Sequence, residues 1–153
     1  MKNYDFTNTI NQFKNTDSGR FGKAFEINVK RYLNGNRGNS GKVSAKGKND
    51  VKSKGLIYEI KSNCGELERI EKNDFIIYSM DNIRDYDKPY NARVINPTDF
   101  ITMLNNLGLV RTKKSTSGTI KTTIQSYKNS KKKTMLLANA LEHYPTLGEW
   151  IVK

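Results

Sequence analysis

The spacing of apolar residues near the start of the chain predicts an amphipathic helix over residues 17–35. Four apolar side chains recur at helical intervals and form one stripe: Phe21, Phe25, Val29 and Tyr32. Asp17 or Ser18 can cap the N-terminus of this helix, and Gly35 is a natural C-terminal stop. Glu26 lies at the border of the stripe, beside the face that is expected to pack inward.

Short apolar runs bounded by turn residues predict strands in the middle of the chain. The clearest is LIYEIKS, residues 56–62, which follows a turn at SKG. Strand geometry assigns its side chains to two faces: Ile57, Glu59 and Lys61 to one, and Leu56, Tyr58 and Ile60 to the other. Further strands are predicted at residues 42–45, 49–52, 74–80 and 92–95.

The second half of the chain reads mainly as helices. A helix is predicted over residues 96–108, with Asn96 as its cap, Pro97 at its first position and Gly108 as its stop. A basic loop, a short helix and a last main helix follow at residues 111–118, 119–127 and 131–144. The order of elements predicts an α/β or α+β fold in one domain, residues 1–153. Its core is expected over residues 18–107, with a basic helical C-terminal extension over residues 108–153.

The charge of the chain indicates what kind of partner it binds. The 153 residues carry a formal net charge of +12, and the stretch from Phe100 to Leu141 contains no Asp or Glu. An excess of this size favours a polyanionic partner, and nucleic acid is the usual one. A membrane surface would require a basic amphipathic helix with a free apolar face, and a charge that serves solubility alone is the remaining alternative.

The scarcity of cysteine and histidine and the lack of long apolar runs argue against several other classes of protein. A single cysteine, Cys64, rules out an internal disulfide framework and fits a reducing cytoplasm, and a single histidine, His143, disfavours a zinc site. The chain has no apolar run long enough to span a membrane, and its first residues lack the apolar stretch of a signal peptide. We therefore expect a cytoplasmic protein with no membrane partner.

Three residues match what phosphodiester hydrolysis requires. Magnesium takes oxygen ligands, lowers the pKa of bound water and holds a phosphate oxygen, and an ammonium group can orient the water or stabilise developing negative charge. Glu59 and Lys61 share one strand face, and Asp50 precedes the hairpin turn and can reach the same point. The backbone carbonyl of Ile60 is a further candidate ligand.

This arrangement resembles the PD-(D/E)xK nuclease superfamily, which includes many restriction endonucleases and the archaeal Holliday junction resolvases. Its motif is an acid, a hairpin and then acid-x-lysine, preceded by a helix that carries another acid; the matching residues are Asp50, Glu59, Lys61 and Glu26. The resemblance spans residues 18–107. Asn49 stands where the family has proline, and no downstream Gln or second Lys can be placed in the site.

The resemblance implies a restriction-endonuclease-like core, with a central mixed β-sheet flanked by helices. It also implies an endonuclease that hydrolyses DNA as a homodimer with Mg²⁺, or with Mn²⁺ as a substitute. Either restriction-like or structure-specific cutting at junctions or flaps is compatible with it. Residues expected to contact the nucleic acid are Arg37, Lys42, Lys46, Lys48, Ser62, Arg111, Lys113, Lys114 and Lys121.

Each of these residues also has a structural interpretation. Glu26 is at helical spacing for a salt bridge with Lys23 or Lys30, Asp50 is a common turn former, and Glu and Lys together suit an exposed strand edge. The basic C-terminal segment can be a solvated tail. Two other functions therefore stay open: a non-catalytic basic module that binds nucleic acid, and an inhibitor of another protein.

Overall fold

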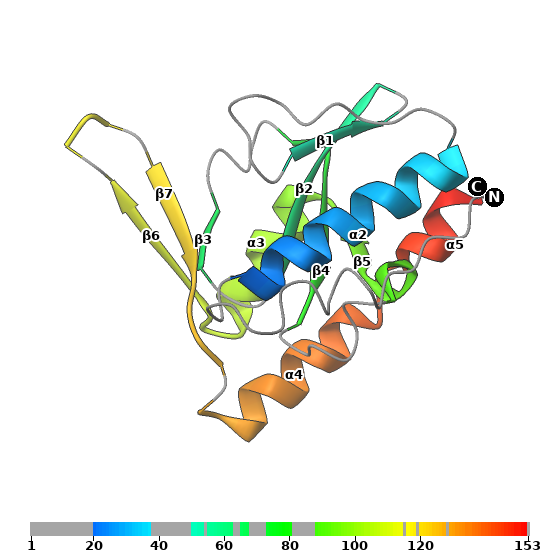
Figure 1. Ribbon diagram of the computed structural model, residues 1–153. Helices are drawn as coiled ribbons and strands as arrows, with labels where there is room; N and C mark the ends of the chain where they lie inside the picture. Colours follow the sequence, from blue (N-terminus) through cyan, green and yellow to red (C-terminus); the bar gives the residue numbers. More distant parts are fainter. Residues whose placement is uncertain are drawn as a thin grey trace.

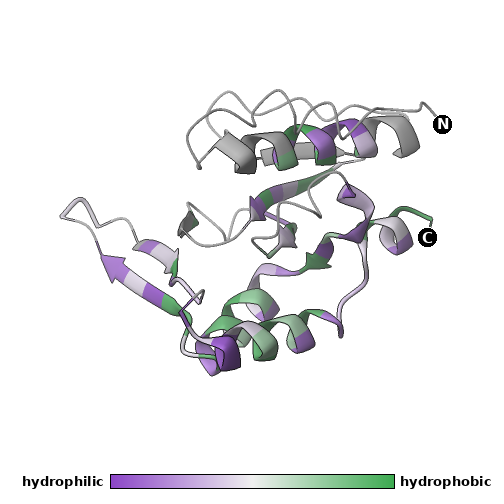
Figure 2. Cartoon of the chain, turned by 60° about the horizontal axis from the view of Figure 1, so that its bottom comes forward, coloured by the Kyte–Doolittle hydropathy of each residue, from purple (hydrophilic) through white to green (hydrophobic). Residues whose placement is uncertain are grey.

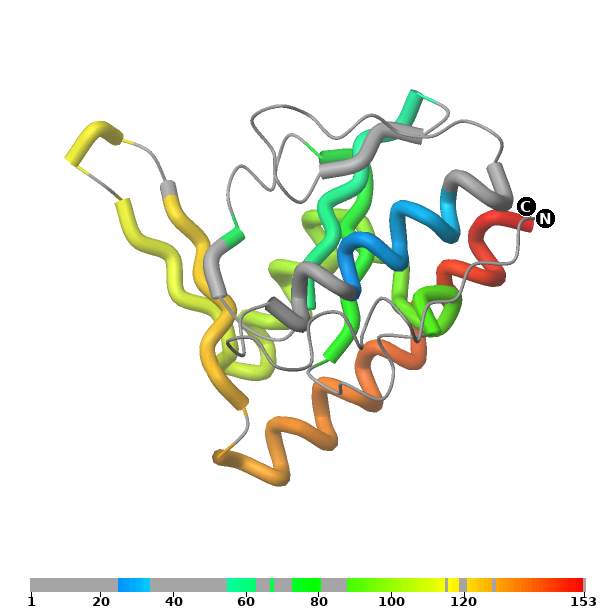
Figure 3. Tube along the Cα trace, viewed as in Figure 1, coloured from blue at the N-terminus to red at the C-terminus, as the bar shows by residue number. Residues whose placement is uncertain are grey.

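The computed structural model describes residues 20–37, 50–53, 55–62, 65–67, 73–80, 88–114, 116–118, 120–127 and 129–152. Within these ranges the side chains of residues 20–24, 34–37, 50–53, 65–66 and 120 are not described. The chain forms a mixed α/β structure whose elements are ordered along it as in Figures 1 and 3. None of the described helices is both long and apolar enough to cross a membrane.

Within the part of the chain that the structure describes, the larger sheet has four strands in the order β1-β2-β4-β5. They are β1 (Asp50–Ser53), β2 (Leu56–Ser62), β4 (Phe75–Ser79) and β5 (Arg93–Ile95). The β1–β2 and β4–β5 pairs are antiparallel, whereas β2 and β4 run parallel, so the sheet is mixed. The turn between β1 and β2 includes Gly55 at a φ of 81°, a conformation that glycine adopts without the strain that a Cβ would bring.

Helices cover both faces of this sheet and divide the core into two clusters. On one face, α2 (Arg20–Arg37) packs its buried Phe25, Val29 and Leu33 with Tyr58 and Ile60 of β2. The helix α5 (Leu147–Ile151) adds Leu147 to this cluster, where Trp150 also packs. Figure 1 shows α2 lying across β2, with α5 alongside it.

The opposite face packs against the second half of the chain. Here α3 (Pro97–Asn106) and α4 (Lys131–Leu141) bury apolar side chains against Ile76 and Tyr78 of β4. Ile77, between these two, belongs to the cluster under α2, which is the alternation expected of a strand buried on both faces. Figure 2 shows the hydrophobic residues of α3 and α4 where the two helices meet.

The predicted elements around the central sheet are confirmed. The strands expected at residues 49–52, 56–62, 74–80 and 92–95 correspond to β1, β2, β4 and β5. Asn96 caps α3 by accepting a hydrogen bond from the backbone N–H of Asp99 at 2.8 Å, and Gly108 follows the helix with a φ of 68°. The strand expected at residues 42–45 and the caps Asp17 and Ser18 lie outside the described residues.

Two predictions are wrong. Gly35 does not end α2, which continues to Arg37, because glycine weakens a helix by about 1 kcal/mol without forbidding it. The C-terminal extension is not wholly helical, because the expected loop and short helix form an antiparallel hairpin of β6 (Val110–Lys114) and β7 (Ile120–Ile124). A short strand that was not predicted, β3 (Gly65–Leu67), pairs with β7 and completes a three-stranded sheet.

Candidate active site

The backbone register places the first two candidate acids side by side. Asp50 at the start of β1 is the Cα partner of Glu59 on β2, the last pair of the β1–β2 ladder. Directly paired residues of an antiparallel ladder lie about 4.5–5.5 Å apart at their Cβ atoms and share one face of the sheet. The two acidic residues are therefore neighbours in the backbone register, although they lie nine positions apart in the sequence. The side chain of Asp50 is not described.

Glu59 is buried, with 4% of its surface exposed. Its Oε2 accepts a hydrogen bond from Nδ2 of Asn73 at 3.0 Å, and Asn73 is itself only 8% exposed. A carboxylate in this setting needs such donors, because an ionised group taken out of water loses its hydration. Asn73 was not predicted from the sequence; it precedes β4 in a polar stretch, and nothing in its local pattern indicates a contact with Glu59.

The neighbouring Asp74 holds the start of β4 against β2. Its Oδ2 accepts a hydrogen bond from the backbone N–H of Ile57 at 2.8 Å, and its own N–H donates to the carbonyl of Ile57 at 2.8 Å. The parallel ladder then starts at the pair Tyr58 and Phe75. This anchor fixes where Asn73 lies relative to Glu59, so the segment that enters β4 positions the buried carboxylate.

Lys61 follows Glu59 on the same face of β2. It is half-buried and is the Cα partner of Tyr78, while Glu59 is the partner of Ile76. Both of these β4 residues pack toward α3 and α4, so Glu59 and Lys61 share the sheet face opposite the one that α2 covers. Ser62, at the end of β2, is half-buried beside Ser79.

Glu26 has a different environment. It is 5% exposed on α2, the helix that covers the Tyr58 and Ile60 face of β2, and its Oε1 forms an ion pair with Nζ of Lys30 at 2.5 Å. The salt bridge considered for Glu26 from the sequence is therefore present. Because α2 contacts both β1 and β2, it approaches the strands that carry the other two acids, but from the other side of the sheet.

Ile60 can offer only its backbone to a metal ion. Its side chain is 2% exposed and packs in the cluster under α2. Ile60 is also the first residue of β2 beyond the β1 pairing, which ends at Asp50 and Glu59. Its predicted role as a carbonyl ligand stays a prediction.

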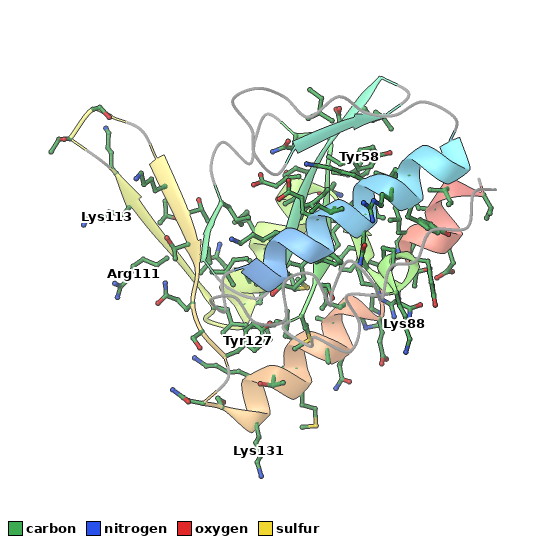
Figure 4. The ribbon with its side chains drawn as sticks, viewed as in Figure 1. Tyr58, Lys88, Arg111, Lys113, Tyr127 and Lys131 are labelled. Atoms are coloured by element: carbon green, nitrogen blue, oxygen red, sulfur yellow. The ribbon has the colours of Figure 1, made fainter. Side chains whose placement is uncertain are left out.

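Apart from Ser62, the predicted nucleic-acid contacts fall into two groups. Arg37 ends α2, and its side chain is not described; Lys42, Lys46 and Lys48 lie outside the described residues. The other basic residues are brought together by the hairpin: Arg111, Lys113 and Lys114 on β6 and Lys121 on β7 are all exposed. Figure 4 shows Arg111 and Lys113 pointing outward from β6.

Among the described side chains, no three His, Cys, Asp or Glu residues gather into a group that could hold a metal ion. A group that includes Asp50 is not covered by that statement. The chain matches no protein family model, no curated protein and no solved structure.

Proposed function

We propose that this protein is a metal-dependent endonuclease that hydrolyses DNA phosphodiester bonds. The observation that supports the proposal most directly is the pairing of Asp50 with Glu59 at the end of the β1–β2 ladder. Lys61 lies two residues further along the same face of β2, so an ammonium group follows the two carboxylate positions. A hairpin that brings two acids and a lysine together provides the groups that hydrolysis of a phosphodiester needs.

The donor set fits a hard divalent cation. Carboxylate oxygens of Asp50 and Glu59 are the ligands that Mg²⁺ prefers, and Mn²⁺ accepts the same set. When bound there, the ion would polarise the phosphate and lower the pKa of a water molecule. Asn73 holds the Glu59 carboxylate in one orientation through its 3.0 Å hydrogen bond, and the half-buried Lys61 can stabilise negative charge on the phosphate.

The substrate and assembly follow from the same proposal. The net charge of +12 and the exposed cations of β6 and β7 suit a DNA backbone. Each chain offers one such site, so cutting both strands of a duplex needs two copies, which favours a homodimer with two-fold symmetry. Restriction-like and structure-specific cutting both remain within the proposal.

The test is a cleavage assay with a matched set of carboxylate variants. Supercoiled plasmid and a four-way junction are incubated with the protein and Mg²⁺, Mn²⁺ or EDTA. Cleavage is expected with either metal, none with EDTA, and a loss of at least about a hundredfold in Asp50→Asn and Glu59→Gln. Glu142→Gln is the control because Glu142 is an exposed carboxylate at the end of α4. Cleavage that survives EDTA or Glu59→Gln would overturn the proposal.

One observation favours a second candidate, a nucleic-acid-binding module that does not cut. Glu59 is 4% exposed and bonded to an amide, and a carboxylate with a purely structural role can have the same surroundings. This candidate predicts DNA binding in EDTA with no cleavage of any substrate in either metal. The assay above therefore separates the two functions.

A further inference from the structure

We propose that the β6–β7 hairpin, with Arg111, Lys113, Lys114 and Lys121, is a basic ribbon that binds in the major groove of duplex DNA. These two strands with their four cations form the basic hairpin. The inference deepens the proposed function by naming the surface that holds the substrate. It shares the premise that DNA is the ligand, but it does not require the protein to cut DNA.

The basic hairpin extends beyond the strand that supports it. Among the described residues, β3 pairs with β7 at residues 122–124, whereas the β6–β7 ladder continues through Lys113–Lys121 to Lys114–Ile120. The side chains from Arg111 to Lys114 are all exposed. Thr112 and Lys114 are exposed although they share a face with Val110, which pairs with the buried Ile124 at the base of the hairpin. Figure 1 shows the end of the hairpin standing clear of the helices, and Figure 2 shows it as mainly hydrophilic.

The base of the hairpin is held firmly, so its direction is fixed. Ile124 is 1% exposed in the core with Leu109, and the N–H of Gln125 donates to the carbonyl of Leu109 at 2.6 Å. Tyr127, which follows, is also buried, and its hydroxyl lies 3.4 Å from that of Tyr78 on the central sheet. A ribbon anchored at its base in this way needs less ordering when it binds, which reduces the entropic cost of binding.

The charges on the hairpin are arranged unfavourably for the isolated protein. Lys113 and Lys121 are Cα partners in the β6–β7 ladder, so two like charges stand directly opposite each other on one face. Such a pair destabilises a sheet, and Arg111 adds a third cation to the same face. Among the side chains that the structure describes, which exclude that of Glu66 on β3, no carboxylate forms an ion pair with these cations. Phosphates would relieve this repulsion, which indicates a polyanion as the partner.

The shape of the hairpin selects the kind of polyanion. The major groove of B-form DNA is about 12 Å wide and admits a two-stranded β-ribbon, whereas the corresponding groove of A-form RNA is too deep and narrow for side chains to read. The basic hairpin carries cations on both faces, because Lys114 lies on the opposite face from Lys113. A ribbon between two phosphate backbones requires cations on both faces. Its described tip residues are small: Thr116, Ser117 and Gly118.

The experiment measures binding without cleavage. Fluorescence anisotropy in EDTA compares a 20-base-pair DNA duplex with an RNA duplex of the same sequence, over a range of salt concentrations. Lys113→Ala and Lys121→Ala are each expected to weaken DNA binding by about five- to tenfold at 0.1 M salt and to lower the salt slope by about 0.9. Lys88→Ala is the matched control, because Lys88 is exposed and Figure 4 shows it on the other side of the molecule.

Each outcome decides the inference. Preference for DNA over RNA, together with weakening in both hairpin variants but less than about twofold in Lys88→Ala, supports it. Binding of both duplexes equally, binding of neither, or hairpin variants that bind like the control would overturn it. If binding depends on the hairpin but no DNA is cleaved, only the nuclease proposal is overturned. If metal-dependent cleavage occurs and the hairpin variants do not affect it, only this inference is overturned.

Discussion

Asn73, two residues before β4, donates a hydrogen bond to the buried carboxylate of Glu59 on β2, at 3.0 Å. This contact joins the start of the segment that enters β4 to the middle of β2, and the hydrogen bonds of Asp74 to Ile57 keep it in place. A candidate metal ligand is thereby held in one orientation before any ligand arrives. A ligand that is already oriented does not have to be reoriented during the reaction, so the free-energy cost of that step is lower.

The first prediction removes this donor. Asn73→Ala is expected to lower the free energy of unfolding by about 1–3 kcal/mol, because the buried Glu59 carboxylate loses a hydrogen-bond donor. This free energy is measured by urea denaturation, with the fluorescence of Trp150 as the signal. Trp150 is the single tryptophan, and its ring packs edge-on against that of Phe75 with 4.5 Å between the ring centroids. Asn139→Ala, at an exposed position of α4, is the control. Equal stability of the two variants would show that the contact contributes nothing.

A second prediction concerns Lys61. Lys61→Met keeps most of the aliphatic stem and removes the ammonium group, so single-turnover cleavage is expected to fall by about a hundredfold or more. Binding of DNA in EDTA should change little, because Lys61 is half-buried whereas the basic hairpin is exposed. Lys88→Met provides the matched control. If binding and cleavage fell together by the same factor, Lys61 would be a substrate contact rather than a group that acts in the reaction.

The third prediction separates Glu26 from the other acids. Glu26→Gln is expected to lower stability by about 0.5–2 kcal/mol, because the ion pair with Lys30 is lost from a buried position. It should retain cleavage within about tenfold of the wild type, in contrast to Glu59→Gln. A double-mutant cycle with Lys30→Met measures the pair itself. Loss of cleavage as complete as in Glu59→Gln would instead place the Glu26 carboxylate on the metal.

A fourth prediction uses the first turn of α4. Ser130 caps this helix, and three exposed lysines follow at Lys131, Lys132 and Lys133, where the helix dipole disfavours positive charge. Lys131→Glu is therefore expected to raise the free energy of unfolding by about 0.3–1 kcal/mol. Lys88→Glu is the control for the change in net charge. An unchanged or lower stability in Lys131→Glu, relative to this control, would contradict the prediction.

Local patterns determined much of the fold. The alternation in residues 56–62 predicted β2, and the Asn96, Pro97 and Gly108 signals predicted α3, because caps and periodicity act within a few residues. The hairpin was missed because RTKK and IKTTI carry little apolar alternation; these strands form where β7 pairs with β3 and Ile124 enters the core.

The sequence by itself determined the elements around the central sheet, the charge excess and the acid-x-lysine spacing on one strand face, but not the strands β3, β6 and β7. Tertiary structure decided which of these residues meet. Pairing register set Asp50 opposite Glu59, and parallel packing of β4 brought Asn73 to the same carboxylate. The placement of α2 on the other face of β2 joined Glu26 to Lys30. Contacts between distant segments depend on how whole elements pack, which spacing along the chain does not specify.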